Sequence, residues 1–561
     1  MLTENQLSLL PELPELATVA CGPGTEVGEV FTRQWTVEMI LDLVGYQVEA
    51  DLASLVILEP ACGTGAFLLP IVDRLLASAR RHGRDVAELA GAVRAFEISG
   101  PNADLARKAV AARLAQGGAH DEVARGLAAS WIVTGDFLLA DVEPASADLV
   151  VGNPPYVRLE GVPISLMEAY RRACPTMRGR SDLYVGFIER GLGTLRPGGR
   201  LGFICADRWM HNQYGAGLRR LVSQSFAMET VVSMHDVDAF EDEVSAYPAV
   251  VVIRNDEQGR AAVVDTTARF SAEDAHRVVD WVNKGHSGRT RSESFEASRL
   301  GGWFDGNRLW PTGGPGQLAL LAEIESRWPT LEDPATGTRV GIGVATGCDD
   351  VFITTDPGLV EADRLLPLRR AGDIASGQLG WSGAYLVNPW DERGLVRLAD
   401  WPKLADYLQA NDVRLRARHV GTRRPAQWYR TIDRIDPTLV GRRRLLLPDM
   451  KASAHPVLDD GPHYPHHNLY HVTSQRWDLE VLGGLLLSDV ANLFVGAYSV
   501  KMRGGCYRFQ AQYLRTIRVP PPDAIDRRTT IELARAFAAR DAEQATAAAA
   551  AAYGIDRDRL A

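Results

Sequence analysis

Four consecutive residues, Asn153-Pro154-Pro155-Tyr156, have the types and spacing that suit chemistry on an amino group. They follow residues 148–152, an apolar run whose β-formers predict a buried strand. Because proline has no backbone N–H, the carbonyl oxygens beside it are left to face a ligand. The Asn153 amide oxygen and the Pro154 carbonyl can accept both hydrogens of an amine on a flat ring, while Tyr156 stacks on that ring. A turn that merely caps a strand is the alternative.

A second candidate site is the glycine-rich turn Glu59-Pro-Ala-Cys-Gly-Thr-Gly65, which follows a predicted strand at 55–58 and precedes a helix. Glycines at such a turn let the backbone approach a ligand closely. The turn lacks the third glycine of the dinucleotide fingerprint and the Lys-Ser/Thr of a P-loop. The Glu59 carboxylate would also repel phosphate, so a cationic or zwitterionic ligand is favoured, with a plain tight turn as the alternative.

Acidic residues stand at the ends of two further predicted strands. Residues 92–97 form a strand that ends in Glu97, and residues 131–135 form a strand that is followed by Asp136 and Phe137. Doubly wound sheets bind ligands at the carboxyl ends of their strands, where a carboxylate can hold ribose hydroxyls or accept from an adenine amino group. Each acid alone also suits a loop, but with the two motifs above they predict one site at one sheet edge.

The composition is that of an ordinary globular protein. Of 561 residues, 46% are hydrophobic and 24% charged, which suggests about two to four domains. No apolar run could span a bilayer and no signal peptide is visible, so we expect a soluble cytoplasmic protein without a membrane partner. Six scattered cysteines form no Cys-x-x-Cys pair. Four histidines lie close together without Cys or a His-Glu-x-x-His pattern, so we expect no metal at His463, His466, His467 and His471.

The net charge of −10 argues mildly against a protein that coats nucleic acid. Residues 414–451 reverse that balance, with ten Arg and one Lys against three Asp. Arginines interleaved with Trp428 and Tyr429 suit phosphate and base contacts, although a merely solvated face is the alternative. The arginines that we expect to bind DNA are Arg423, Arg424, Arg442, Arg443 and Arg444.

The two motifs, in this order and about ninety residues apart, resemble the cofactor loop and catalytic motif of the N6-adenine DNA methyltransferases. The resemblance is to the gamma class, the TaqI-like and Eco57I-like enzymes. It covers residues 28–255 well and the remainder loosely. Further segments resemble that family: 28–33, where the usual Thr-Pro is Thr32-Arg33, and 196–206, 238–253, 340–352, 501–510 and 513–520.

The resemblance implies an α/β fold: a Rossmann-like S-adenosylmethionine-dependent methyltransferase domain with a mixed seven-stranded sheet, followed by a mixed α/β target-recognition domain. S-adenosylmethionine would be held by Thr32, Glu59, Ala61, Gly63 and Gly65, with Glu97 at the ribose and Asp136 and Phe137 at the adenine. The catalytic residues would be Asn153, Pro154, Pro155 and Tyr156, with direct methyl transfer and no metal. Because the target atom is hidden in the duplex, the adenine must be flipped out and held by Tyr156 and Phe240, with Tyr247 as a rival.

Composition and motifs together predict the domain boundaries. The stretch from 285 to 317 is rich in Gly, Ser and Arg, including Gly313-Gly-Pro-Gly316, and is typical of a linker. We therefore expect an N-terminal arm (1–27), a methyltransferase domain (28–284), the linker (285–317), a DNA target-recognition domain (318–525) and a C-terminal helical tail (526–561).

The predicted function is a site-specific adenine methyltransferase acting on double-stranded DNA, in a restriction-modification or phage-defence system. Protein-glutamine methyltransferases also use Asn-Pro-Pro-Tyr, but they would not need a long basic C-terminal domain. A non-catalytic DNA-reading subunit is the other alternative, and motifs intact at every expected position argue against it. Since about 27 residues precede the first motif, we expect any nuclease to be a separate restriction endonuclease or another defence-system protein.

Overall fold

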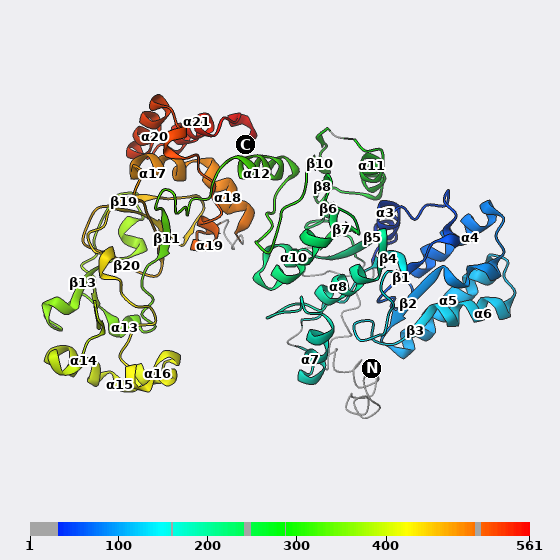
Figure 1. Cartoon of the computed structure of the whole chain (residues 1–561), viewed down its shortest axis with the longest axis horizontal. Helices are drawn as coiled ribbons and strands as arrows, with labels where there is room; N and C mark the ends of the chain where they lie inside the picture. Colours follow the sequence, from blue (N-terminus) through cyan, green and yellow to red (C-terminus); the bar gives the residue numbers. More distant parts are fainter. Residues whose placement is uncertain (1–31, 159–160, 241–247, 287, 500–505, 561) are drawn as a thin grey trace. The chain divides into compact units, whose positions relative to one another are not determined.

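The computed structural model describes residues 32–158, 161–240, 248–286, 288–499 and 506–560. The chain divides into two compact units, Met1–Ala319 and Leu320–Ala561 (Figure 1). The expected N-terminal arm, residues 1–27, lies outside the described residues.

A ten-stranded sheet forms the centre of the first unit, in the order β3-β2-β1-β4-β5-β7-β6-β8-β10-β9 (Figure 1). Its first five strands in this order run parallel: β3 (Ile132–Thr134), β2 (Val93–Glu97), β1 (Ile57–Glu59), β4 (Ala147–Gly152) and β5 (Leu195–Ala206). β7 (Pro248–Arg254) is antiparallel to both β5 and β6 (Ala227–Ser233). This confirms the Rossmann-like class. The sheet is wider than the expected seven strands because β8 (Ala261–Thr266), β10 (Phe295–Leu300) and β9 (Thr290–Arg291) extend it.

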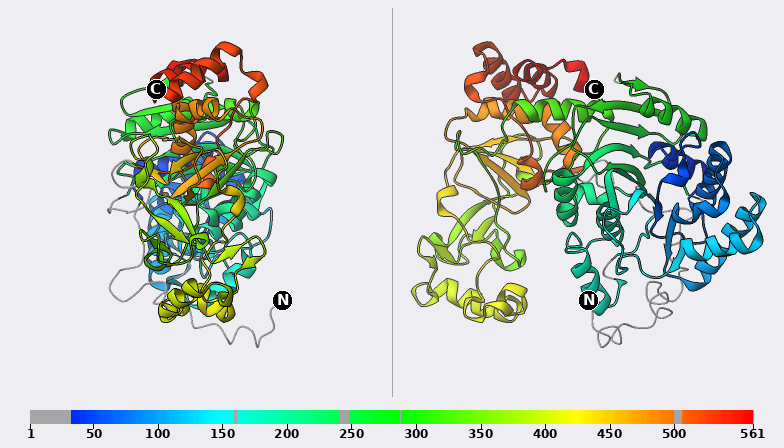
Figure 2. Two further views of the ribbon diagram at one scale, coloured as in Figure 1. Left: turned by 90° about the vertical axis from the view of Figure 1, so that its left-hand side faces the viewer. Right: turned by 45° about the vertical axis from the view of Figure 1, so that its right-hand side comes forward.

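The two faces of this sheet are covered by separate groups of helices. Neighbouring residues of a strand point to opposite faces, and in β4 Leu149 packs into one core while Val150 packs into the other. The first core includes residues of α3 (Gln34–Leu43), α4 (Leu68–His82), α5 (Gly100–Gln116) and α6 (Asp121–Trp131); the second includes residues of α7 (Ile164–Ala173), α8 (Tyr184–Thr194) and α10 (Ala216–Ser225). Figure 2 shows the first group in blue to cyan and the second in green. The result is a three-layer α/β unit.

Much of the segment expected to be a linker, 285–317, is instead part of this unit. β10 pairs with β8 along its whole length, from Phe295 opposite Thr266 to Leu300 opposite Ala261. Farther along, Trp310 is buried and packs edge-on against Trp209 at 5.2 Å between ring centroids. Gly, Ser and Arg dominate the composition of the segment. The composition therefore did not indicate the few apolar side chains that pack into the first unit.

The second unit is mixed α/β, as expected. One four-stranded sheet has the order β11-β21-β17-β19 and another has the order β12-β14-β13-β20. The strands of the first are β11 (Arg339–Ile342), β21 (Leu469–Thr473), β17 (Arg444–Pro448) and β19 (Val457–Asp459); those of the second are β12 (Ile353–Thr354), β14 (Tyr385–Val387), β13 (Leu365–Arg369) and β20 (Tyr464–Pro465). Three short helices lie in the chain between β14 of the second sheet and β17 of the first: α14 (Pro402–Ala410), α15 (Asp412–Ala417) and α16 (His419–Arg423).

The C-terminal helices form a packed layer, whereas the sequence suggested a tail. Leu487 of α17 (Leu479–Leu487) shares a small core with residues of α20 (Arg527–Ala539) and α21 (Ala542–Tyr553). A Cβ added at Gly483 would lie 2.6 Å from the Phe537 ring, so glycine is what allows α17 and α20 to approach. No single described helix is long and apolar enough to cross a membrane; α17 and α18 (Asp489–Tyr498) meet those two criteria only as a pair, bent by 62°.

Candidate functional site

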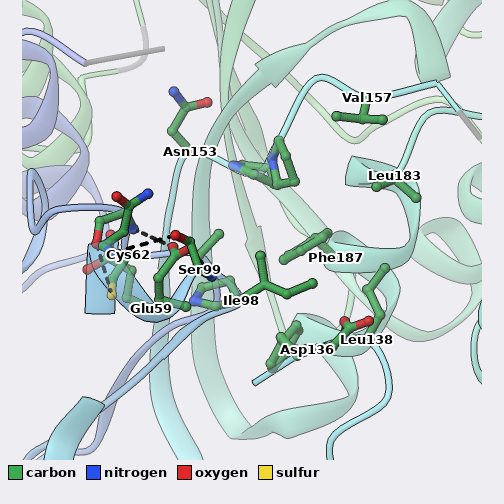
Figure 3. A pocket seen from close by; sticks show the side chains of 18 of the residues that line it. Glu59, Cys62, Ile98, Ser99, Asp136, Leu138, Asn153, Val157, Leu183 and Phe187 are labelled. Atoms are coloured by element: carbon green, nitrogen blue, oxygen red, sulfur yellow. Dashed lines mark hydrogen bonds between the residues drawn. The ribbon is translucent and has the colours of Figure 1, made fainter. Parts of the chain in front are cut away.

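The carboxyl ends of β1, β2, β3 and β4 surround one pocket in the first unit (Figure 3). These strands are parallel neighbours, so the residues that follow them meet at one edge of the sheet. The pocket is lined by the following predicted residues: Thr32, Glu59, Ala61, Gly63, Glu97, Asp136, Phe137, Asn153, Pro154, Pro155 and Tyr156. Two other predicted residues, Gly65 and Phe240, do not line it. A Cβ added at Gly65 would instead contact the side chains of Leu68 and Leu69, both at 3.9 Å.

Glu97 joins the end of β2 to the glycine-rich turn. Its Oε2 accepts a hydrogen bond from the Gly63 N–H at 2.8 Å, and its Oε1 accepts one from the Ser99 N–H at 2.8 Å. Gly63 has a φ of +52°, in the left-handed region that favours glycine. Ser99 also caps α5 by accepting from the Asn102 N–H, and both residues line the pocket. The sequence analysis did not predict Ser99 and Asn102, although a serine directly before the first residue of a helix is a recognisable cap signal.

Glu59 is the most deeply buried acid of the pocket, with 2% of its surface exposed. Its Oε2 has no hydrogen-bond partner among the described residues. Burial, and next the neighbouring Glu97 carboxylate, raise the pKa of Glu59 well above its ordinary value. No Lys, Arg or His side chain lines the pocket to offset these acids. The pocket is therefore suited to a ligand that carries positive charge.

An aromatic and acidic wall closes the other side of the pocket. The Asp136 Oδ1 accepts from the Leu138 N–H at 2.9 Å, and its Oδ2 accepts from the Tyr170 hydroxyl at 2.7 Å. Burial raises the pKa of Asp136. The Phe137 ring stacks on Phe187 at 5.7 Å and 29°. Tyr170 and Phe187 were not predicted, because they come from α7 and α8 and nothing in their local sequence indicates this contact.

The Asn153 loop leaves β4 at the same edge. The Asn153 amide donates from Nδ2 to the Thr32 Oγ1 at 3.2 Å. Thr32 also forms an antiparallel bridge with Phe240, so the chain before the glycine-rich turn is joined to the segment that carries Phe240. The Tyr156 ring meets Phe240 edge-on, with centroids 6.1 Å apart and planes at 84°. Phe240 is only 3% exposed. The rival aromatic, Tyr247, lies outside the described residues.

The arginines predicted to bind DNA differ in their surroundings. Arg423 and Arg424 line a pocket of the second unit that is rich in arginine. Arg443 is exposed and forms ion pairs with Asp460 and Glu480, while Arg442 is partly exposed. Arg444 was predicted wrongly, because its side chain is fully buried. It is the first residue of β17, and its guanidinium pairs with the buried Asp459 at 2.7 Å and donates to the Leu439 carbonyl at 2.6 Å.

Comparison with known proteins places these features in one family. Residues 126–240 match the model of the Eco57I restriction-modification methylases. The Type II methyltransferase M.XhoI of Xanthomonas vasicola is 43% identical over 540 residues, which cover 95% of this chain and 98% of that protein. M.PaeR7I of Pseudomonas aeruginosa, also a Type II methyltransferase, is 42% identical over 557 residues, 98% of this chain and 96% of its own length.

Among solved structures, the Type IIL restriction-modification enzyme MmeI in complex with DNA aligns over 93% of this chain and 74% of its own, with a TM-score of 0.49 and 13% identity. The sequence relatives are far closer and extend over nearly the whole chain, including both compact units. This chain belongs to the Type II methyltransferases of the Eco57I-like restriction-modification methylases, which are site-specific DNA methyltransferases that use S-adenosylmethionine.

Proposed function

We propose that this methyltransferase modifies the N6 amino group of adenine in duplex DNA. The observation that carries the proposal is that Asn153, Pro154 and Tyr156 line the same pocket as Glu59 and Glu97. One pocket thus offers acceptors for an amino group beside carboxylates for a cationic cofactor.

The pocket fits S-adenosylmethionine on its own chemistry. The buried Glu59 Oε2 has no partner in the described part of the chain, so it is available to accept from the amino group of the methionine moiety. Glu97 is held in place by two backbone N–H groups and can accept from the ribose hydroxyls. Asp136 can accept from the adenine amino group, and the stacked Phe137 and Phe187 supply an apolar surface for the adenine ring.

When bound, S-adenosylmethionine supplies a methyl group on a positively charged sulfur. The nitrogen lone pair of the target amine is delocalised into the adenine ring, and this makes it a poor nucleophile. If the Asn153 amide oxygen and the Pro154 carbonyl accept the two amino hydrogens, they hold the nitrogen in one orientation and favour the tetrahedral geometry that attack requires. The hydrogen bond from the Asn153 Nδ2 to the Thr32 Oγ1 restrains the orientation of the same amide group. This arrangement uses no covalent enzyme intermediate.

Entry of a flipped base requires a rearrangement of Tyr156 or Phe240. In the proposal the ring of Tyr156 stacks on one face of the adenine, with Phe240 on the other. The edge-on contact between the two rings leaves no space for a base between them, so one ring must turn or shift as the base enters. Burial raises the pKa of Tyr156, and its hydroxyl has no partner among the described residues, so the ring is held mainly by packing.

Phosphate contacts are proposed for the arginine-rich pocket of the second unit. Four arginines line it, and no carboxylate does: Arg418, Arg423, Arg424 and Arg430. Arg418 donates to the carbonyls of Thr346 and Trp428, both at 2.9 Å, and within the described residues none of the four forms an ion pair. Their positive charge is thus available to a phosphodiester backbone, where each neutralised phosphate releases a counterion. A separate restriction endonuclease is proposed as the functional partner.

The test is methylation of unmodified genomic DNA with tritiated S-adenosylmethionine, followed by nucleoside analysis. We expect the label in N6-methyladenine with the wild type and with Asn283→Ala, which changes an exposed asparagine outside the pocket. The label should be absent with Asn153→Ala. Label in N4-methylcytosine would refute the choice of base, and label in added protein but not in DNA would refute DNA as the substrate.

A further inference from the structure

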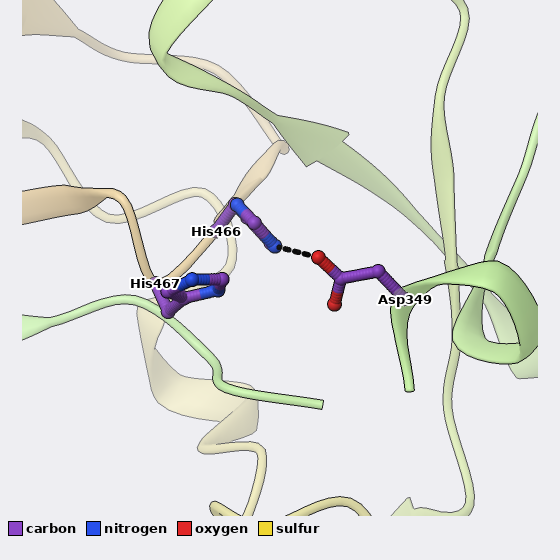
Figure 4. A group of neighbouring side chains, drawn as sticks. All are labelled: Asp349, His466 and His467. Atoms are coloured by element: carbon purple, nitrogen blue, oxygen red, sulfur yellow. Dashed lines mark hydrogen bonds and ion pairs between the residues drawn. The ribbon is translucent and has the colours of Figure 1, made fainter. Parts of the chain in front are cut away.

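Three potential metal ligands come together in the second unit (Figure 4). Asp349 begins α13 (Asp349–Phe352), while His466 and His467 lie between β20 and β21. One ligand atom from each residue lies within 4.8 Å of the other two. The Asp349 Oδ2 and the His466 Nε2 are 3.1 Å apart, and the two imidazole rings have centroids 4.1 Å apart. The sequence could not indicate this cluster, because Asp349 is 117 residues from His466.

The other two histidines of the sequence cluster take no part. His463 contacts the Arg369 guanidinium through Nδ1 at 2.8 Å. His471 is buried in β21, where its ring stands directly over Gly341. The pair His466 and His467 is therefore singled out by the fold and not by the spacing of histidines in the chain.

Backbone hydrogen bonds hold His466 and His467 in place. The His466 N–H donates to the Arg369 carbonyl at 2.9 Å, and the His467 N–H donates to the Val344 carbonyl at 3.0 Å. A Cβ added at Gly343 would lie 2.2 Å from the His466 carbonyl oxygen, so only glycine allows the two loops to approach this closely. The Asp349 Oδ1 accepts from the Thr346 hydroxyl, which orients the carboxylate toward the histidines.

The His466 ring presents one nitrogen to the cluster. Its side chain is almost fully buried, and its Nε2 is the atom that faces Asp349. The other ring nitrogen, Nδ1, is buried and has no hydrogen-bond partner among the described residues. Nε2 is therefore the ring nitrogen that is placed to bind an ion together with the Asp349 carboxylate.

The distances agree with a tetrahedral ion. With metal–ligand bonds of about 2.0–2.1 Å, two ligands of a tetrahedral zinc site lie roughly 3.3 Å apart. The 3.1 Å between Asp349 and His466 is close to that value. His467 is exposed and Asp349 partly so, which leaves room for water to complete the coordination. Two imidazoles and one carboxylate favour a borderline transition metal over Mg²⁺ or Ca²⁺, which prefer all-oxygen sites.

We propose that Asp349, His466 and His467 bind one divalent transition-metal ion of the zinc class. The ion would join the start of α13 to the connection between β20 and β21, and so fix two loops of the second unit. This site is independent of the S-adenosylmethionine pocket, because none of its three residues lines that pocket. A metal-free chain would therefore still bind the cofactor.

A metal site requires His467, whereas a simple hydrogen bond between Asp349 and His466 does not. The full chain, without a histidine tag and freed of metal with a chelator that is then removed, is titrated with Zn²⁺ alone. Binding is followed by competition with a chromophoric zinc chelator and by elemental analysis. We expect one Zn²⁺ per wild-type chain. His467→Ala leaves the Asp349–His466 pair intact and should weaken binding at least tenfold, as should Asp349→Asn.

His120→Ala, which changes an exposed histidine at the start of α6, is the matched control and should bind as the wild type does. Zn²⁺ should also raise the unfolding midpoint of the wild type but not of His467→Ala, so the effect of the metal is separated from a fault in folding. Equal Zn²⁺ affinity in wild type and His467→Ala would overturn the proposal, and so would no stoichiometric binding to the wild type.

Discussion

Replacing Glu59 by glutamine should stabilise the free protein and weaken its cofactor binding, two opposite effects of one change. The glutamine keeps the size of the side chain and removes its charge. In the free protein the Glu59 carboxylate is buried near the Glu97 carboxylate, and its Oε2 has no hydrogen-bond partner among the described residues. With the cofactor bound, the same charge would meet a cationic amino group.

The pH dependence follows from the raised pKa of Glu59. In the unfolded chain this carboxyl has its ordinary pKa of 4.5, and in the folded chain a higher one. Between the two values the folded state retains a proton that the unfolded state has lost, so the free energy of unfolding falls as the pH rises. At pH values above the folded pKa, each unit by which the folded pKa exceeds 4.5 lowers the free energy of unfolding by about 1.4 kcal/mol. The Glu59→Gln variant has no such loss. Its free energy of unfolding should therefore equal that of the wild type near pH 4 and exceed it increasingly above pH 4.5.

The loss of binding has its own scale. A hydrogen bond to a charged group is worth about 1.5–3 kcal/mol, which corresponds to an affinity for S-adenosylmethionine that is about 10- to 150-fold weaker. Urea unfolding of wild type and Glu59→Gln from pH 4 to pH 9, and calorimetric titration with the cofactor, measure the two effects. Glu273→Gln, at an exposed position of α11 (Ala272–Asn283), is the matched control. A stability difference that does not change with pH, or unchanged cofactor affinity, would refute the reasoning.

Three further variants test other parts of the molecule. Asn153→Ala should reduce methyl transfer at least a hundredfold while cofactor affinity, measured by calorimetry, stays within about threefold; near-normal transfer would refute the role of the amide. Changing Arg423 and Arg424 together to glutamine should weaken DNA binding and lower the salt slope of log K by about two, and an unchanged slope would remove that pocket from the interface. Arg444→Gln should lower the free energy of unfolding in urea by about 3 kcal/mol, because it removes the closer of the two arginines that pair with the buried Asp459 and leaves only Arg369, at 3.3 Å; a loss below 1 kcal/mol would contradict this.

The pocket could be predicted from the sequence because its residues follow strands. Glu59, Glu97, Asp136 and Asn153 each stand at or just after the end of a strand that the β-branched residues already indicated. Once those strands are parallel neighbours, their carboxyl ends must meet, whatever the loops between them do. The partners of these residues come from helices: Tyr170 reaches Asp136 from α7, and this contact depends on how the helix docks, which no local pattern encodes.

Composition was the weaker guide. The 285–317 segment has the average composition of a linker, yet one amphipathic strand and one tryptophan were enough to bind it to the first unit. An arginine in a basic run can be a DNA contact or a buried structural ion. Arg444 is followed at once by the apolar residues of β17 and is buried with them, while Arg423 lies at the end of a short surface helix. The difference lies in the neighbours of each arginine, not in the charge of the run.

The net charge of −10 hides two pockets of opposite sign. The first has Glu59, Glu97 and Asp136 in its wall and no basic side chain, while the second has four arginines and no acid. A cavity with buried acids attracts a cation and repels phosphate, and an arginine pocket does the reverse. A methyltransferase that takes a cationic cofactor and a polyanionic substrate needs both signs in separate places. If cofactor charge governs the first pocket, the affinity for S-adenosylhomocysteine, which lacks the sulfonium charge, should fall below that for S-adenosylmethionine in the wild type, and Glu59→Gln should narrow the difference. Equal affinities in the wild type would mean that shape, and not charge, selects the ligand.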